Sequence, residues 1–182
     1  GVNSISALQI SNFGTDAMEG QLEGLSSMTA SIEEINDEVD SLLTLSRTFK
    51  AAGEVQLNAD GNIGNLNATD DLPDVVGETA SFVAKGSITN LETAIATLNE
   101  LRSTVSGNVE LIDFDTEAGM DDGLEVLNAS TLAGDITIFA NQGLDIETVA
   151  GGTDATVRLR SLGDNLNVRG DLGNSAISAG AN

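Results

Sequence analysis

Apolar side chains between Asp16 and Gly53 recur in a seven-residue pattern, with two series of positions three residues apart. Such spacing matches the a and d positions of a heptad repeat, so it predicts a long amphipathic helix. We expect this helix to self-associate through its apolar seam, with packing against a second helix of the same chain as the alternative. The predicted seam consists of Met18, Leu25, Ile32 and Val39 at a, and of Met28, Ile35, Leu42 and Phe49 at d.

A second helix is predicted over residues 87 to 106. Its apolar residues follow helical spacing, and Gly107 ends the pattern as a typical helix-terminating residue. The predicted stripe comprises Ile88, Leu91, Ile95, Leu98 and Val105, with Leu101 alongside. Residues 16 to 107 therefore form a predicted helical region that is interrupted once, between the two helices.

The interrupting segment, residues 54 to 86, alternates apolar and polar residues and contains Asp60-Gly61, a dipeptide typical of two-residue β-hairpins. We therefore expect a hairpin there. The same stretch also resembles the calcium loops of EF-hand and dockerin type, in which side-chain oxygens alternate around a glycine. Gln56 and Asn67 stand where such a loop needs carboxylates, which favours the turn. The calcium ligands under the alternative are Asn58, Asp60, Asn62, Asp70 and Asp71.

Beyond Gly107 the apolar period changes to two, in short runs separated by Gly, Asn and Asp. These runs predict a β-rich domain over residues 108 to 182, built as a sandwich, a barrel or an irregular solenoid. The stretch AGDITIFANQGLDIETVAGG resembles the β-solenoid repeats of filamentous-haemagglutinin-type surface proteins, over about the last 50 residues. With an N-terminal arm at residues 1 to 15, the predicted class is α+β: a long heptad helix, a second helix and a β-rich C-terminal part.

Composition and charge exclude several kinds of chemistry and partner. The 182 residues include no histidine, cysteine, tryptophan or tyrosine, so no thiol or imidazole can act as nucleophile, base or soft-metal ligand. The formal net charge of −22 disfavours nucleic acids and anionic membranes. No apolar run approaches the roughly 18 residues of a membrane span, so we expect no membrane insertion. Salt screens such self-repulsion, which favours an extracellular or cell-surface location, with a virion as the alternative.

A second acidic segment, DFDTEAGMDDG, lies between predicted strands. A hard cation would relieve the repulsion among its carboxylates, so calcium is the one cofactor candidate, and a solvated loop is the alternative. The candidate ligands are Asp113, Asp115, Glu117, Asp121 and Asp122. Asn67 and Asn128 begin Asn-X-Ser/Thr triplets and are glycosylation candidates if the chain is exported.

Three functional hypotheses follow from these features. The first is a non-enzymatic structural subunit that self-assembles into an extracellular filament, surface appendage, sheath or virion fibre, through helix packing and strand exchange by the terminal arm. A calcium-dependent surface adhesion or binding module is the first alternative. The second is a glycoside hydrolase that uses carboxylates alone, although sugar sites usually contain the Trp and Tyr side chains that this chain lacks.

Overall fold

The structure, a computed structural model, describes residues 7–13, 22–33, 42–45, 49–65, 72–114, 123–163, 165–169 and 176–179. Within these residues the chain forms sixteen β-strands and no helix. The strands are β1 (Ala7–Phe13), β2 (Leu22–Glu33), β3 (Leu42–Leu45), β4 (Phe49–Ala59), β5 (Asn62–Asn65), β6 (Val75–Ala84), β7 (Ile88–Ser103), β8 (Val109–Asp113), β9 (Leu124–Val126), β10 (Ala129–Thr131), β11 (Ile136–Ala140), β12 (Leu144–Ile146), β13 (Val149–Ala150), β14 (Thr156–Ser161), β15 (Leu166–Val168) and β16 (Ala176–Ala179).

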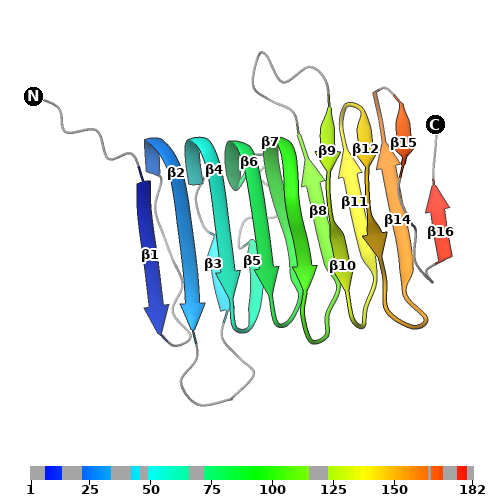
Figure 1. Ribbon diagram of the computed structural model, residues 1–182, viewed down its shortest axis with the longest axis horizontal. Coiled ribbons are helices and arrows are strands. Elements are labelled where there is room, and N and C mark those ends of the chain that lie inside the picture. The colour runs from blue at the N-terminus through cyan, green and yellow to red at the C-terminus, as the bar shows by residue number, and fades with distance from the viewer. Residues whose placement is uncertain are drawn as a thin grey trace, which may run out of the picture.

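These strands wind into a β-solenoid. Each pairing between described strands is parallel and joins equivalent places in successive coils. The coils stack along the longest axis of the molecule, from β1 at one end to β16 at the other (Figure 1). The long strand β7 makes one coil by itself, and the following coils consist of β8 to β10, β11 to β13, and β14 with β15.

Three faces run along the stack, here named A, B and C. Face A contains β3, β5, β8, β11, β14 and β16, face B contains β9, β12 and β15, and face C contains β10 and β13. The strand β7 contributes to all three faces in turn, because it pairs with β8, β9 and β10. On its other side, β7 pairs with β6, which continues faces B and C towards β4, β2 and β1.

The interior is filled by apolar side chains that stack in register from coil to coil. On face A, Ile88, Val109, Ile136 and Val157 pair in succession, and none is more than 1% exposed. The equivalent buried ladders are Ala80, Leu98, Val126 and Ile146 on face B, and Phe82, Leu101, Ala129 and Val149 on face C. Full burial of one such large aliphatic side chain contributes about 1.5–3 kcal/mol, so each coil is held by its contacts with the coils beside it.

Polar side chains connect the coils at the corner before face A. The Oδ1 atom of Asn62 accepts a hydrogen bond from the N–H of Ser87 at 2.7 Å, and that of Asn108 accepts one from the N–H of Asp135 at 3.0 Å. Asp135 in turn accepts a hydrogen bond from the N–H of Thr156 at 2.8 Å. These side chains give main-chain N–H groups a partner at the corner, where the chain turns from one face to the next.

The predicted heptad helix is wrong, and the α+β class and the coiled coil are wrong with it. Of the predicted seam, Leu25, Met28 and Ile32 lie in β2, Leu42 in β3 and Phe49 in β4, whereas Met18, Ile35 and Val39 fall outside the described residues. The pairing of β2 with β4 shifts register twice, between Leu22 and Leu25 and again before Ser27. A bulge inserts an extra residue, so equivalent positions in a strand can lie three residues apart and imitate helical spacing.

The second predicted helix is the strand β7. Its register shifts between Ile88 and Leu91, where Asn90 adopts a φ of 53° and adds a residue between two buried side chains. A second shift in the pairing with β6 lies after Leu98, so Leu101 is the next buried leucine. Both irregularities convert the two-residue period of a strand into a spacing of three.

The predicted hairpin at Asp60-Gly61 is a solenoid corner instead. These residues connect β4 to β5, but β4 pairs with β2 and β6, and β5 pairs with β3 and β7. A tight turn signal is therefore present at the right place in the sequence, but the strands on its two sides belong to different faces. A corner of this kind needs the same compact turn residues as a hairpin.

Two connections between faces A and B are longer than the others, as the corner hydrogen bonds show. The bond from Ser87 to Asn62 spans 25 residues, and the bond from Asp135 to Asn108 spans 27 residues. By contrast, the bond from Thr156 to Asp135 spans 21 residues, and the paired residues Ile88 and Val109 are separated by this same shorter interval. The extra residues follow β5 and β8, and so belong to the two coils that flank the coil of β7.

Candidate functional site

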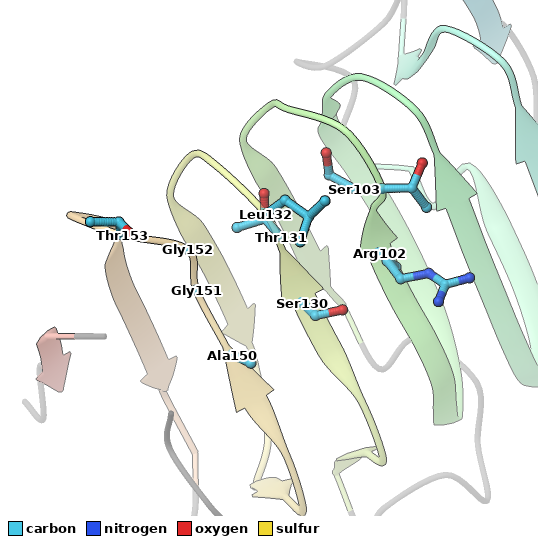
Figure 2. A pocket seen from close by; sticks show the side chains of 10 residues that line it. Arg102, Ser103, Ser130, Thr131, Leu132, Ala150, Gly151, Gly152 and Thr153 are labelled. Carbon is cyan, nitrogen blue, oxygen red and sulfur yellow. The ribbon is translucent and has the colours of Figure 1, made fainter. Parts of the chain in front are cut away.

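A groove of about 510 Å³ crosses face C over three successive coils, at the ends of β7, β10 and β13 (Figure 2). Two rows of residues form much of its lining: Arg102, Ser130 and Ala150 along the strands, and Thr104, Leu132 and Gly152 at the corner that follows. Their buried neighbours on face C point inward, so the strand alternation directs the first row towards solvent. Since paired strands lie about 4.8 Å apart, the groove extends for about 10 Å along the solenoid axis.

Arg102 gives this groove a positive charge in a strongly acidic part of the chain. Residues 86 to 157 contain thirteen acidic residues and one basic residue, Arg102. The Nε atom of Arg102 lies 3.1 Å from Oε1 of Glu100, and the arginine side chain is 45% exposed. A guanidinium group has five N–H donors, so an ion pair at Nε leaves donors for a further acceptor.

Two further features of the groove concern Ser103 and Gly152. Ser103 is 1% exposed, and its Oγ has no hydrogen-bond partner among the described residues. A buried hydroxyl without a hydrogen-bond partner lowers the free energy of unfolding by about 1–3 kcal/mol. A Cβ added at Gly152 would overlap the carbonyl oxygen of Leu132, so the close approach of two coils requires glycine here. Because residue 152 has no side chain, the main-chain carbonyl of Leu132 is not covered by a side chain from the next coil.

The residues of the first predicted calcium loop are separated by the fold. Asn58 lies in β4, Asp60 forms an ion pair with Nζ of Lys85 at 3.2 Å, and Asn62 accepts the corner hydrogen bond from Ser87. The side-chain oxygens of Asp60 and Asn62 therefore have structural partners. Asp70 and Asp71 lie outside the described residues.

Asp113, from the second predicted calcium loop, is buried at the corner between faces A and B. Its Oδ1 accepts hydrogen bonds from Oγ1 of Thr93 at 2.8 Å and from the N–H of Ile95 at 3.2 Å. The same corner holds buried Asp74, whose Oδ2 accepts a hydrogen bond from the N–H of Glu92 at 2.9 Å. Across the described ranges, no three acidic side chains are grouped to hold a metal. Asp115, Glu117, Asp121 and Asp122 lie outside those ranges.

The remaining predicted residues are distributed over the solenoid. Phe49 is 2% exposed and belongs to the hydrophobic core, where it is not available to a partner chain. Asn128 is partly buried between β9 and β10, and its main-chain carbonyl accepts a hydrogen bond from the N–H of Leu101. Asn67, the other glycosylation candidate, lies outside the described residues.

Sequence reasoning did not find the groove. Arg102 was placed on a predicted helix, and its neighbours Ser130 and Ala150 are brought beside it only by the pairing of three coils. Two local signals were nevertheless present: a lone basic residue in a long acidic stretch, and the glycine pair Gly151-Gly152. Neither signal indicates a groove until the coil-to-coil register is known.

The chemistry of the described residues has to support any functional assignment, since relatives supply none. No family model matches this sequence, no curated protein does, and no solved structure does. Helices that could cross a membrane are absent from the part of the chain that the structure describes.

Proposed function

We propose that the protein is a non-enzymatic structural subunit that assembles with copies of itself into an extracellular filament, surface appendage, sheath or virion fibre. The observation that supports this role is the parallel stack of coils, in which main-chain hydrogen bonds and apolar ladders run along one axis. Each coil of a solenoid presents its neighbour with a strand edge, so a second chain can extend the same pattern. The formal charge of −22 suits a saline setting, where salt screens repulsion between copies.

Assembly would use the strand edges at the two ends of the stack. Among the described strands, β1 pairs with β2 alone and β16 pairs with β14 alone. An unpaired strand edge presents N–H and C=O groups to which another chain can add. Because the described pairings are parallel, a copy added in the same manner would join head to tail. The helix seam has no place in this proposal, since its residues lie in strands or outside the described ranges.

Sedimentation velocity across a concentration series, with electron microscopy of the same samples, tests the proposal. We expect larger species as protein concentration rises. We also expect more of them at about 0.5 M than at about 0.02 M sodium chloride, because repulsion between the acidic copies reaches less far at high salt concentration. A chain that stays monomeric under all these conditions would disprove the structural-subunit role.

A pair of proline variants tests the strand-edge mechanism. Adjacent residues of a strand direct their N–H groups to opposite sides, so Ile10→Pro or Ser11→Pro removes a donor on the edge away from β2. We expect one of the two to keep the β-sheet circular dichroism spectrum and lose assembly. If both assemble as well as the unmodified chain, the edge of β1 is not the contact.

The calcium-dependent binding module remains the second candidate function, and one observation favours it. The two long connections follow β5 and β8, which lie on the same face, and both predicted calcium segments extend into them. A bound ion would raise the melting temperature by mass action. Calcium should then stabilise the protein more than sodium chloride at equal ionic strength, and equal effects would exclude the site. No observation favours the hydrolase, since the groove on face C has no carboxylate among its lining residues.

A further inference from the structure

We propose that the groove on face C binds a carboxylate-bearing, hydroxyl-rich small molecule of the sugar-acid type. This binding site is independent of the structural role, because it lies on the side of the solenoid and uses neither β1 nor β16. It rests on the chemistry of the groove: a cation, hydroxyl groups and an exposed leucine.

The positive group selects the charge of the ligand. Arg102 is the one basic side chain in residues 86 to 157, and it lies at the groove and not elsewhere on that acidic surface. Its ion pair with Glu100 uses Nε and orients the guanidinium plane. Arginine recognises planar carboxylates through two parallel N–H donors, which makes a carboxylate the best-matched anionic group.

The remaining lining selects a small polyhydroxylated ligand. Ser130 and Thr153 bring hydroxyl groups to the groove that can donate and accept hydrogen bonds. The Thr104 hydroxyl donates to the main-chain oxygen of Ala84 at 3.2 Å and can still accept a hydrogen bond from a ligand. Leu132 is 67% exposed, so together with Ala150 it offers an apolar surface for the C–H face of a sugar ring. The volume of about 510 Å³ lies within the range of about 300–1,000 Å³ that small-molecule sites occupy.

Nuclear magnetic resonance of the full chain, labelled with ¹⁵N, tests the proposal with glucuronate as the probe and glucose as its neutral counterpart. The titrations use about 0.15 M salt, at which charges more than about 8 Å away are screened and the local contact with Arg102 dominates. We expect glucuronate to shift the amide signals of Ser130, Gly151 and Gly152 with millimolar affinity. Glucose should shift them at least about tenfold more weakly, since it lacks the charge-assisted hydrogen bonds.

Three variants distinguish ligand binding in the groove from a general effect of the protein's charge. Arg102→Gln should weaken glucuronate binding at least about tenfold. Arg102→Lys should give an intermediate loss of affinity, because lysine keeps the positive charge but lacks the two parallel N–H donors of arginine. Arg169→Gln is the matched control: Arg169 is also exposed and ion-paired, to Asp145 at 2.6 Å, but it lies outside the groove. Unchanged signals elsewhere in the spectrum show that each variant is folded.

Three outcomes would overturn the proposal. The first is an absence of glucuronate-dependent shifts at about 50 mM ligand, a concentration well above a millimolar dissociation constant. The second is an equal response to glucose, which would remove the role of the carboxylate. The third is binding that Arg102→Gln and Arg169→Gln weaken to the same extent. None of these outcomes bears on the proposed self-assembly of the solenoid, because sedimentation measures assembly separately.

Discussion

At the scale of single residues, the corner before face A shows how polar side chains hold successive coils together. The hydrogen bond that Asp135 accepts from the N–H of Thr156 lowers the pKa of the Asp135 carboxyl below its ordinary value, and the nearby Arg158 guanidinium lowers it further. Partial desolvation opposes these effects without cancelling them. The charged form of Asp135 is therefore favoured in the folded chain, which links this corner to pH.

Asp135→Asn should lower the free energy of unfolding at neutral pH, and the loss should shrink as the pH falls below the ordinary aspartate value of 3.8. A carboxyl with a lowered pKa in the folded state adds stability above its unfolded pKa and loses it as the pH falls through the folded pKa. Asparagine keeps an acceptor for the N–H of Thr156, so the variant removes mainly the charge. Urea denaturation at a series of pH values measures the difference.

Asp154→Asn is the control for this experiment. Asp154 is exposed and has a φ of 63°, a conformation that asparagine adopts as readily as aspartate. Its replacement should therefore change the free energy of unfolding little. A pH dependence shared equally by the two variants would contradict the assignment to the corner.

At the scale of elements, β7 shows that burial and not spacing distinguishes a strand from a helix. The apolar stripe of the predicted helix includes Val105, yet this side chain lies beyond the end of β7 and is 60% exposed. Leu101, which the stripe contained only as a flanking residue, is completely buried on face C. Thr93, which a helix would turn away from the stripe, is also completely buried.

Val105→Asp and Leu101→Asp therefore form a matched pair. In the solenoid, Val105→Asp should change the free energy of unfolding by no more than about 0.5 kcal/mol, as is usual for exposed positions. Leu101→Asp places a carboxylate in the core and should cost several kcal/mol or prevent folding. Thermal and urea denaturation of both variants measure this. Comparable large losses would indicate the helical stripe instead.

At the scale of the whole molecule, stability is distributed over coils that interact mainly with their nearest neighbours. The hydrogen bond from Thr156 to Asp135 joins equivalent corners that are 21 residues apart, which is the length of a coil without a long connection. In a stack of this kind, the total free energy is approximately a sum of coil and interface contributions. Removal of one complete coil should therefore shorten the stack without changing its pattern.

Deletion of residues 136 to 156 tests this additivity. The deletion places Val157 where Ile136 stood, opposite Val109, and the next inward residue Leu159 opposite Leu111. We expect a folded protein with a lower melting temperature and an unchanged β-sheet circular dichroism spectrum. Deletion of residues 136 to 145 is the control, because it brings Ile146, the corner after it and the face C strand β13 onto face A and should unfold that end of the stack. Equal effects of the two deletions would contradict a coil-by-coil architecture.

A repeat was visible in the sequence, but its variable length concealed it. Glycine, then a small polar residue, then Ile or Val precedes face A in Gly61-Asn62-Ile63, Gly86-Ser87-Ile88, Gly107-Asn108-Val109 and Gly134-Asp135-Ile136. The two long connections make the interval between successive corners vary along the chain. The β-rich character after residue 107 was predicted, because the strands there alternate regularly. The segment from Asp16 to Gly53 and residues 87 to 106 were predicted as helices, because bulges in the pairing of β2 with β4 and in β7 altered the period. Residues 54 to 86 were predicted as a hairpin.

Local chemistry alone determined some properties of this protein. The absence of thiols and imidazoles, the charge of −22 and the alternation in strands such as β8 and β11 depend only on residues and their neighbours. The tertiary structure decided the rest. Whether a spacing of three is a helical turn or a bulge depends on the strand opposite, as at Asn90. The partners of Asp113, and the groove that Arg102 shares with Ser130 and Ala150, likewise exist only once separate coils pair in register, since register is a long-range interaction that no local pattern specifies.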